Sequence, residues 1–188
     1  MGALLERVVF SSSGALPFGT HDYPTRHLSL TPGNFMDVLQ ASCAIPFVLK
    51  SVHDIEGAPS GAYWDGGITD YHLHLDWKTS ASSAKQSGLV LYPHFQKSVV
   101  PGWLDKQLKW RHKATSFLDN TVVLAPNPEW VKTLPNGKLP DRQDFSTYGQ
   151  DLQSRVKVWQ AAVSASEQMA AEFAAWLSQP QLSEVQDL

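Results

Sequence analysis

The sequence contains a single cysteine, Cys43, and no long run of apolar residues. One cysteine excludes an intrachain disulfide and favours a reducing compartment. Because Cys43 lies in a run of small residues, we expect it to be a buried apolar side chain rather than a nucleophile. No apolar stretch approaches the length of about 18 residues that a membrane-spanning helix needs.

Charge is also scarce, since charged residues make up 18 % of the chain and the net charge is −3. This balance gives no reason to expect a nucleic-acid partner. The first residues, Met1–Glu6, lack the Ser or Thr of a myristoylation signal and do not resemble a signal peptide. We therefore expect a protein that is cytoplasmic or peripherally associated with a membrane.

Apolar residues are plentiful, at 43 % of 188 residues, which is enough for the core of a single domain spanning residues 1–188. Strand-like runs alternate with helical patterns, which predicts an α/β layered sandwich with a mostly parallel central sheet. Asn34 is expected to cap the first helix, and Pro46 to end it. The expected strands are 7–12, 26–30, 47–55, 88–92 and 121–124; the expected helices are 34–46, 101–113, 128–134 and 146–179, with a surface loop at 79–87.

The most informative stretch is Gly61–Asp70, in which Asp65 precedes two consecutive glycines, Gly66 and Gly67. Glycine reaches positive φ and lets another backbone or a substrate come close. Asp65 could therefore point into a site instead of into bulk water. An Asp-Gly pair between apolar residues is also typical of a tight hairpin turn, and that alternative stays open.

A second motif lies upstream, where Ala41–Pro46 reads Ala-Ser-Cys-Ala-Ile-Pro. Together with Tyr63–Ile68, which reads Tyr-Trp-Asp-Gly-Gly-Ile, it resembles the C-terminal half of a patatin-like phospholipase. The resemblance covers mainly residues 7–71. It implies that Asp65 is the acidic member of a Ser-Asp catalytic dyad. The Asn and Pro that usually follow the family's Asp-Gly-Gly are replaced here by Asp70–His72.

The nucleophile motif of such hydrolases, Gly-x-Ser-x-Gly, is absent from the sequence. The nearest match, Phe10–Gly14, places Ser12 after an expected strand but lacks the first glycine, and Pro17 and Gly19 follow in place of a helix. Ser12 is therefore a weak candidate. The resemblance implies that the serine precedes the aspartate, so we expect the nucleophile in an upstream segment or a partner chain.

These motifs imply a lipid acyl hydrolase, a serine-type phospholipase or esterase of lipid degradation that needs no cofactor. Asp65 is the catalytic residue expected in this chain, with Gly66 and Gly67 giving structural support to the site. The chain alone is expected to be inactive on its lipid or other ester substrate. The alternative class is a non-catalytic remnant that binds lipid or a protein partner.

A metal-dependent hydrolase is a further alternative, because Asp70, His72, His74 and Asp76 alternate with apolar residues. On a strand these four side chains would share one face, and His-x-His-x-Asp is a spacing of dinuclear metallohydrolases. Further ligands would have to come from elsewhere, with His94 and His112 as the candidates. A half-exposed edge strand with its polar face in water explains the same pattern.

Residues 101–113 combine basic and apolar side chains on an expected short helix. Such a helix could lie on an anionic membrane surface, which would benefit a lipid-hydrolysing enzyme. It could equally be a solvated helix whose tryptophans pack inward. The basic and apolar side chains of residues 101–113 are Trp103, Leu104, Lys106, Leu108, Lys109, Trp110, Arg111 and Lys113.

The apolar stripe of the expected helix 146–179 is predicted to belong to the core, with docking to a partner as a minor alternative.

Overall fold

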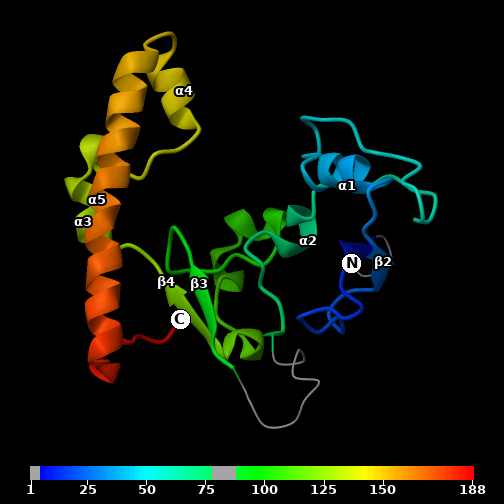
Figure 1. Cartoon of the computed structure of the whole chain (residues 1–188), viewed down its shortest axis with the longest axis horizontal. Coiled ribbons are helices and arrows are strands. Elements are labelled where there is room, and N and C mark those ends of the chain that lie inside the picture. The colour runs from blue at the N-terminus through cyan, green and yellow to red at the C-terminus, as the bar shows by residue number, and fades with distance from the viewer. Residues whose placement is uncertain (1–4, 78–87) are drawn as a thin grey trace. The chain divides into compact units, whose positions relative to one another are not determined.

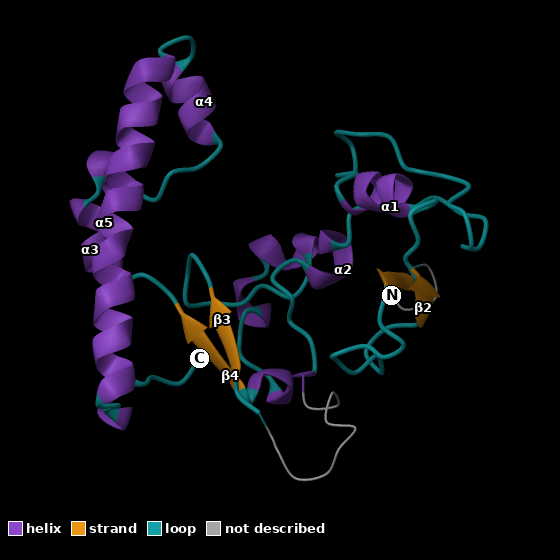
Figure 2. Ribbon diagram, viewed as in Figure 1, coloured by secondary structure: helices purple, strands orange, loops and turns teal. Residues whose placement is uncertain are grey.

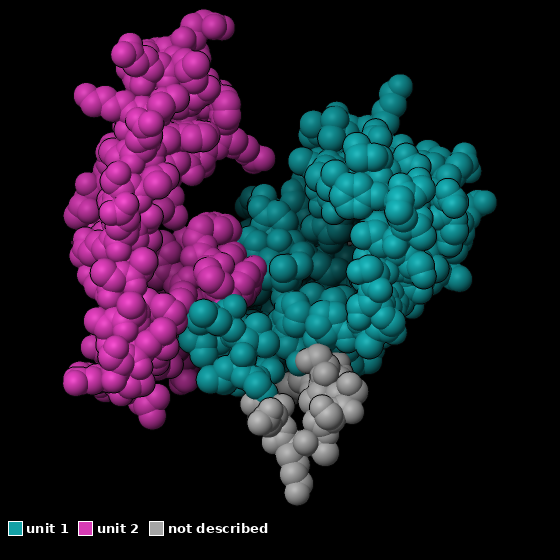
Figure 3. Space-filling model, viewed as in Figure 1, with its two compact units in different colours: residues 1–91, 98–122 teal, residues 92–97, 123–188 magenta. Residues whose placement is uncertain are grey.

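The computed structural model describes residues 5–77 and 88–188 (Figure 1). The chain divides into two compact units, which Figure 3 colours separately. Unit 1 comprises residues 1–91 and 98–122, and unit 2 comprises residues 92–97 and 123–188. The surface loop expected at 79–87 lies outside the described residues. The expectation of one domain over 1–188 stays a prediction, since compact units also occur within single domains.

The fold is mixed α/β, as expected, with two small sheets and five α-helices in the described residues (Figure 2). The strands are β1 (Arg7–Ser11), β2 (Thr25–Ser29), β3 (Val90–Pro93) and β4 (Thr121–Leu124). The helices are α1 (Phe35–Ser42), α2 (Gly67–Asp70), α3 (Pro128–Thr133), α4 (Gln143–Tyr148) and α5 (Leu152–Ser178). Short 3₁₀ helices lie at Trp103–Gln107, Lys109–Arg111, Ser116–Leu118, Pro135–Gly137 and Leu182–Glu184.

Strand β1 pairs with β2 in parallel, with Val9 opposite His27. Both strands lie close to the expected ranges, 7–12 and 26–30. In β1 only Arg7 is fully buried, and the other residues are half-buried. Strands β3 and β4 form the second sheet, in which successive hydrogen bonds advance in the same direction along both strands, as in a parallel pair.

Helix α1 begins and ends close to the expected residues, but Asn34 does not cap it through its side chain. The Asn34 side chain is 2 % exposed and bonds the preceding loop instead. Its Oδ1 accepts from the Thr31 N–H at 2.9 Å, and its Nδ2 donates to the carbonyls of Ser29 and Glu56. Asn34 therefore ties β2 and a distant turn to the start of α1.

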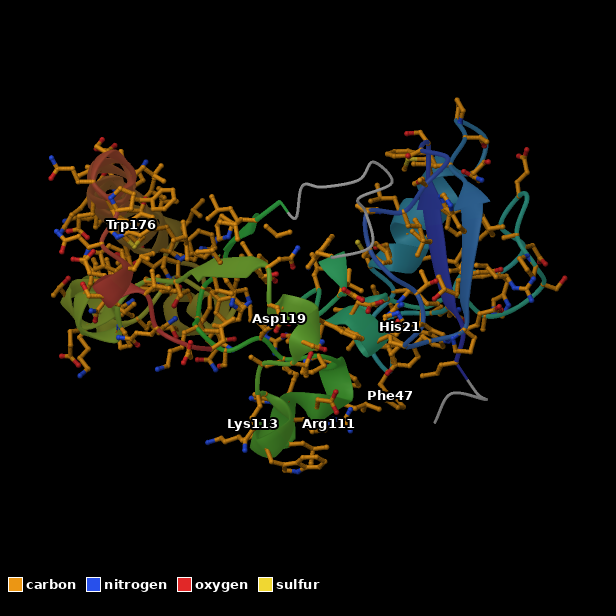
Figure 4. The ribbon with its side chains drawn as sticks, turned by 90° about the horizontal axis from the view of Figure 1, so that it is seen from below. His21, Phe47, Arg111, Lys113, Asp119 and Trp176 are labelled. Atoms are coloured by element: carbon orange, nitrogen blue, oxygen red, sulfur yellow. The ribbon has the colours of Figure 1, made fainter. Side chains whose placement is uncertain are left out.

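Several large apolar side chains of α1 and of the turn after it are exposed. Cys43, expected to be buried, is exposed. Phe47 is 95 % exposed and has a φ of 67°, so it projects from a left-handed turn (labelled in Figure 4). We call this surface the α1 apolar face; its exposed members are Phe35, Met36, Leu39, Ile45, Phe47, Val48 and Leu49.

Two predicted elements of unit 1 take another form. The strand expected at 47–55 is reduced to one antiparallel bridge between Val52 and Tyr63, because Phe47 and Asp54 have left-handed φ values that interrupt an extended chain. The helix expected at 101–113 is replaced by two 3₁₀ helices separated at Leu108, whose ψ is 68°. None of the helices in the described part of the chain is long and apolar enough to cross a bilayer.

In unit 2 the long helix predicted for 146–179 is α5, preceded by the separate helix α4, which packs beside one of its ends (Figure 2). Gly149 has a φ of 52° and ends α4, and Asp151 caps α5 by accepting from the Ser154 N–H. The stripe of α5 expected in the core is largely exposed. Its exposed members are Leu152, Val156, Val163 and Leu177.

Asp144 joins α4 to α5 and is almost fully buried. Its carboxylate accepts from Lys138 Nζ at 2.7 Å, from the Asp141 N–H at 3.0 Å and from Trp159 Nε1 at 2.9 Å. The hydrogen bond from Lys138, helped by that from the Asp141 backbone, lowers the pKa of Asp144 from its ordinary value of 3.8. These bonds hold residues 138–141, α4 and α5 together. Few apolar side chains are buried in this part of unit 2.

We expect the stability of unit 2 to fall on acidification, because a depressed carboxyl pKa contributes stability that is present above 3.8 and lost as the pH falls below it. Replacing Asp144 by asparagine should lower the melting temperature at pH 7 and flatten its dependence on pH between 5 and 2. Glu167→Gln, an exposed change on α5, should leave both unchanged. Circular dichroism at 222 nm measures the transition; an Asp144→Asn protein that melts like the wild type would refute this role.

Candidate functional site

The two motifs of the resemblance lie against one another in unit 1. The backbone N–H of Asp65 donates to the carbonyl of Ala44 at 3.1 Å. Ala44 is among the most buried residues, at 1 % exposure. The end of α1 and the Asp-Gly-Gly corner are therefore joined by a buried backbone contact, although 21 positions separate them in the sequence.

The carboxylate of Asp65 lies at the start of α2. Its Oδ1 accepts from the Gly67 N–H at 2.7 Å, and its carbonyl accepts from the Ile68 N–H at 3.2 Å. The chain thus turns into a helix, and the hairpin alternative is wrong. Among the described residues none donates to the other carboxylate oxygen, Oδ2. Asp65 is half-buried, and Oδ2 keeps its capacity to accept a further hydrogen bond.

Gly67 acts by allowing close approach, and neither Gly66 nor Gly67 adopts a positive φ. Gly66 has a φ of −61°, which corrects the expectation of a left-handed corner. A Cβ on Gly67 would lie 3.0 Å from Asp65 Oδ1, closer than such atoms normally come. A Cβ on Gly66 would meet nothing within 4 Å. The lack of a Cβ on Gly67 therefore lets the Asp65 carboxylate lie close to it, and the space beside Gly66 is open.

A neighbouring segment fixes α2 in place. The backbone N–H groups of Tyr71 and His72 donate to the carbonyls of Pro101 and Val100, at 2.8 and 3.1 Å. A Cβ on Gly102 would lie 2.8 Å from the carbonyl oxygen of Ile68, so only glycine lets the two segments meet this closely. The helix that follows Asp65 is thus held by hydrogen bonds and close packing against residues 100–102.

Arg7 holds the other end of α2 by a buried ion-pair cluster that the sequence did not reveal. Its guanidinium is bidentate to Asp70, at 2.8 and 2.7 Å, and bidentate to Asp22, at 2.8 and 2.7 Å. Burial alone would disfavour the charge, but the two carboxylates outweigh it and raise the pKa of Arg7. Burial likewise would raise the pKa of Asp22, and the bonds from Arg7 hold it below its ordinary value.

The residues proposed as metal ligands do not share a strand face. Asp70 ends α2 and pairs with Arg7, and His72 Nδ1 accepts from the Val100 N–H at 3.0 Å. His74 follows a left-handed residue, and burial lowers its pKa from the ordinary 6.5. Asp76 lies 3.8 Å from His21. In the described residues no three His, Cys, Asp or Glu side chains form a group that could hold a metal ion.

The serines near the first strand form a contact that the sequence analysis missed. Ser12 is exposed. Its neighbour Ser11 places Oγ 2.8 Å from Nε2 of His27, because the parallel register brings the ends of β1 and β2 together. Among the described residues no carboxylate bonds the His27 ring. Ser11 Oγ also donates to the Ser13 carbonyl. The pair lacks the third group that orients a catalytic base.

Comparison of the chain with protein-family models, with curated proteins and with solved structures found no match. The assignment of a function therefore depends on the two motifs and on the geometry around Asp65.

Proposed function

We propose that this chain is the aspartate-bearing part of a patatin-like lipid acyl hydrolase, in which Asp65 is the base of a Ser-Asp dyad. The observation that carries the proposal is the 3.1 Å bond from the Asp65 N–H to the Ala44 carbonyl. That bond joins the small-residue helix end to the Asp-Gly-Gly corner, the two features on which the resemblance depends. The proposed fold is the layered α/β sandwich of that family.

The carboxylate of Asp65 is arranged for proton transfer to a single oxygen. The Gly67 N–H occupies Oδ1 and fixes the orientation of the group. In the proposed reaction Oδ2 accepts the proton of a serine hydroxyl while Oγ attacks the ester carbonyl. The protonated Asp65 then gives that proton to the departing alcohol. Water then attacks the acyl-serine while Oδ2 takes its proton; the bond between Oγ and the acyl group breaks, the free acid leaves, and Asp65 returns the proton to the serine Oγ.

The surroundings of the corner support an additional protein segment that carries the serine. Among the described residues β1 pairs only with β2, so its other edge is free to accept a strand. The α1 apolar face would be covered by the same segment. Seven large apolar side chains are exposed on α1 and the turn after it, and large exposed apolar surfaces mark interaction sites. The open space beside Gly66 leaves room for a serine elbow near Asp65.

A fluorophosphonate probe, which reacts with activated serines, tests the proposal. The present chain should remain unlabelled. A form of the protein that includes an upstream Gly-x-Ser-x-Gly segment should be labelled on that serine and should hydrolyse a p-nitrophenyl ester. Labelling of the present chain, with Ser11 as the first residue to examine, would overturn the proposal. Absence of labelling in the longer form would favour the non-catalytic remnant that binds lipid or a protein partner.

A further inference from the structure

Residues 101–113 form a compact projection of unit 1, which we call the basic lobe. Its two 3₁₀ helices are closed by backbone hydrogen bonds from Leu108 to Asp105 and from Arg111 to Leu108, at 2.8 and 2.7 Å. His112 Nε2 lies 2.9 Å from the Asp105 carbonyl and ties the end of the lobe to its start. The lobe therefore has a defined shape, although it is not the continuous helix that was expected.

Three apolar side chains of the basic lobe are exposed, whereas Trp103 is half-buried. Trp110 is 68 % exposed and Leu104 is 59 % exposed, and Leu108 is exposed beside them. The alternative in which the tryptophans pack inward therefore does not hold for Trp110. Tryptophan and leucine at an exposed tip are typical of groups that enter the interfacial region of a bilayer.

Positive charge surrounds these apolar groups. Lys109, Arg111 and Lys113 are exposed, and Figure 4 labels the last two on the green segment at the lower edge of that view. The carboxylate of the lobe, Asp105, is mostly buried and paired with Arg111 at 2.9 Å. Lys106 lies over the Tyr71 ring at 4.6 Å. The lobe thus carries four cations against one carboxylate, in a chain whose net charge is −3.

We infer that the basic lobe docks on an anionic lipid surface, with Trp110, Leu104 and Leu108 entering the headgroup region. Charge complementarity selects this partner, because a lipid bilayer offers both the negative surface and the apolar layer that the lobe presents together. The lobe packs through Gly102 against α2, the helix that begins beside Asp65. The inference rests on the proposed function for its biological meaning, since docking would bring the dyad to its lipid.

Sedimentation with vesicles tests the inference on the chain as it stands. We expect binding to phosphatidylcholine vesicles that contain about 30 % phosphatidylserine, weak binding to pure phosphatidylcholine, and loss of binding at high salt. Neutralising Lys109, Arg111 and Lys113 to glutamine should lower the partition coefficient about a hundredfold. A double variant at Lys109 and Lys113, which keeps the Arg111–Asp105 pair, should lower it about tenfold or more.

The matched control removes the same charge elsewhere, as Lys50→Gln, Lys132→Gln and Lys157→Gln together, and should bind like the wild type. Leu104→Ser with Trp110→Ser should weaken binding while leaving the charge unchanged. Equal binding of the lobe variant and the control, or displacement by soluble glycerophosphoserine, would overturn the inference. Ester hydrolysis is measured separately, on a soluble substrate and in the form that carries the nucleophilic serine, so failure of docking and failure of the proposed activity give different results.

Discussion

Asp65→Asn should lower kcat for a p-nitrophenyl ester about 10²- to 10⁴-fold in a form of the protein that carries the nucleophilic serine. Asparagine keeps the size of the side chain and can still accept the Gly67 N–H through its amide oxygen. It cannot take the proton of the serine hydroxyl. The corner should therefore fold normally while the attack on the ester slows. Steady-state kinetics at saturating substrate give kcat directly.

Asp54→Asn is the matched control for this prediction. Asp54 lies in the same unit, is exposed and has a φ of 56°, a conformation that asparagine adopts as readily as aspartate. Its replacement should leave kcat unchanged. An Asp65→Asn enzyme that keeps its turnover, with the same circular dichroism spectrum as the wild type, would remove Asp65 from the mechanism.

Arg7→Met should destabilise unit 1 by about 3–5 kcal/mol, because removal of one partner from a buried ion pair leaves the other uncompensated. Here two carboxylates, Asp22 and Asp70, would lose their shared cation in a largely buried position. The pKa of Asp22 is held below 3.8 by Arg7, so its share of the stability is present above that pH and lost below it. The difference between variant and wild type should therefore shrink as the pH falls toward 2.

Urea denaturation gives the free energy of unfolding, and hydrogen exchange at the amides of β1 assigns the change to unit 1. Arg26→Met is the control, because Arg26 pairs with Glu6 at 2.6 Å but both side chains are well exposed. An exposed pair of this kind is worth at most about 1 kcal/mol. Equal effects of the two substitutions would show that the cluster at Arg7 is not what holds α2.

The sequence predicted the elements whose signals are local. The β-branched runs placed β1 and β4, and Pro128 marked the start of α3 at its first position. Each of these features depends on residues that are close in the chain.

Features that depend on distant partners were missed or predicted wrongly. Arg7 and Asp70 are 63 positions apart, and no local pattern indicates that they pair. The apolar pattern of α5 predicted a buried stripe, but a periodic pattern identifies an apolar face without identifying what covers it. The strand expected at 47–55 failed because Phe47 and Asp54 adopt left-handed φ values, which neither residue type signals by itself.

The most direct test of the central claim is the distance between Asp65 and a serine in a crystal structure of the protein with its Gly-x-Ser-x-Gly segment. The account predicts that serine Oγ lies at hydrogen-bond distance, about 2.6–3.2 Å, from Oδ2 of Asp65, while Oδ1 keeps its bond to the Gly67 N–H. A serine elbow that packs elsewhere, with Oδ2 of Asp65 facing solvent, would contradict it.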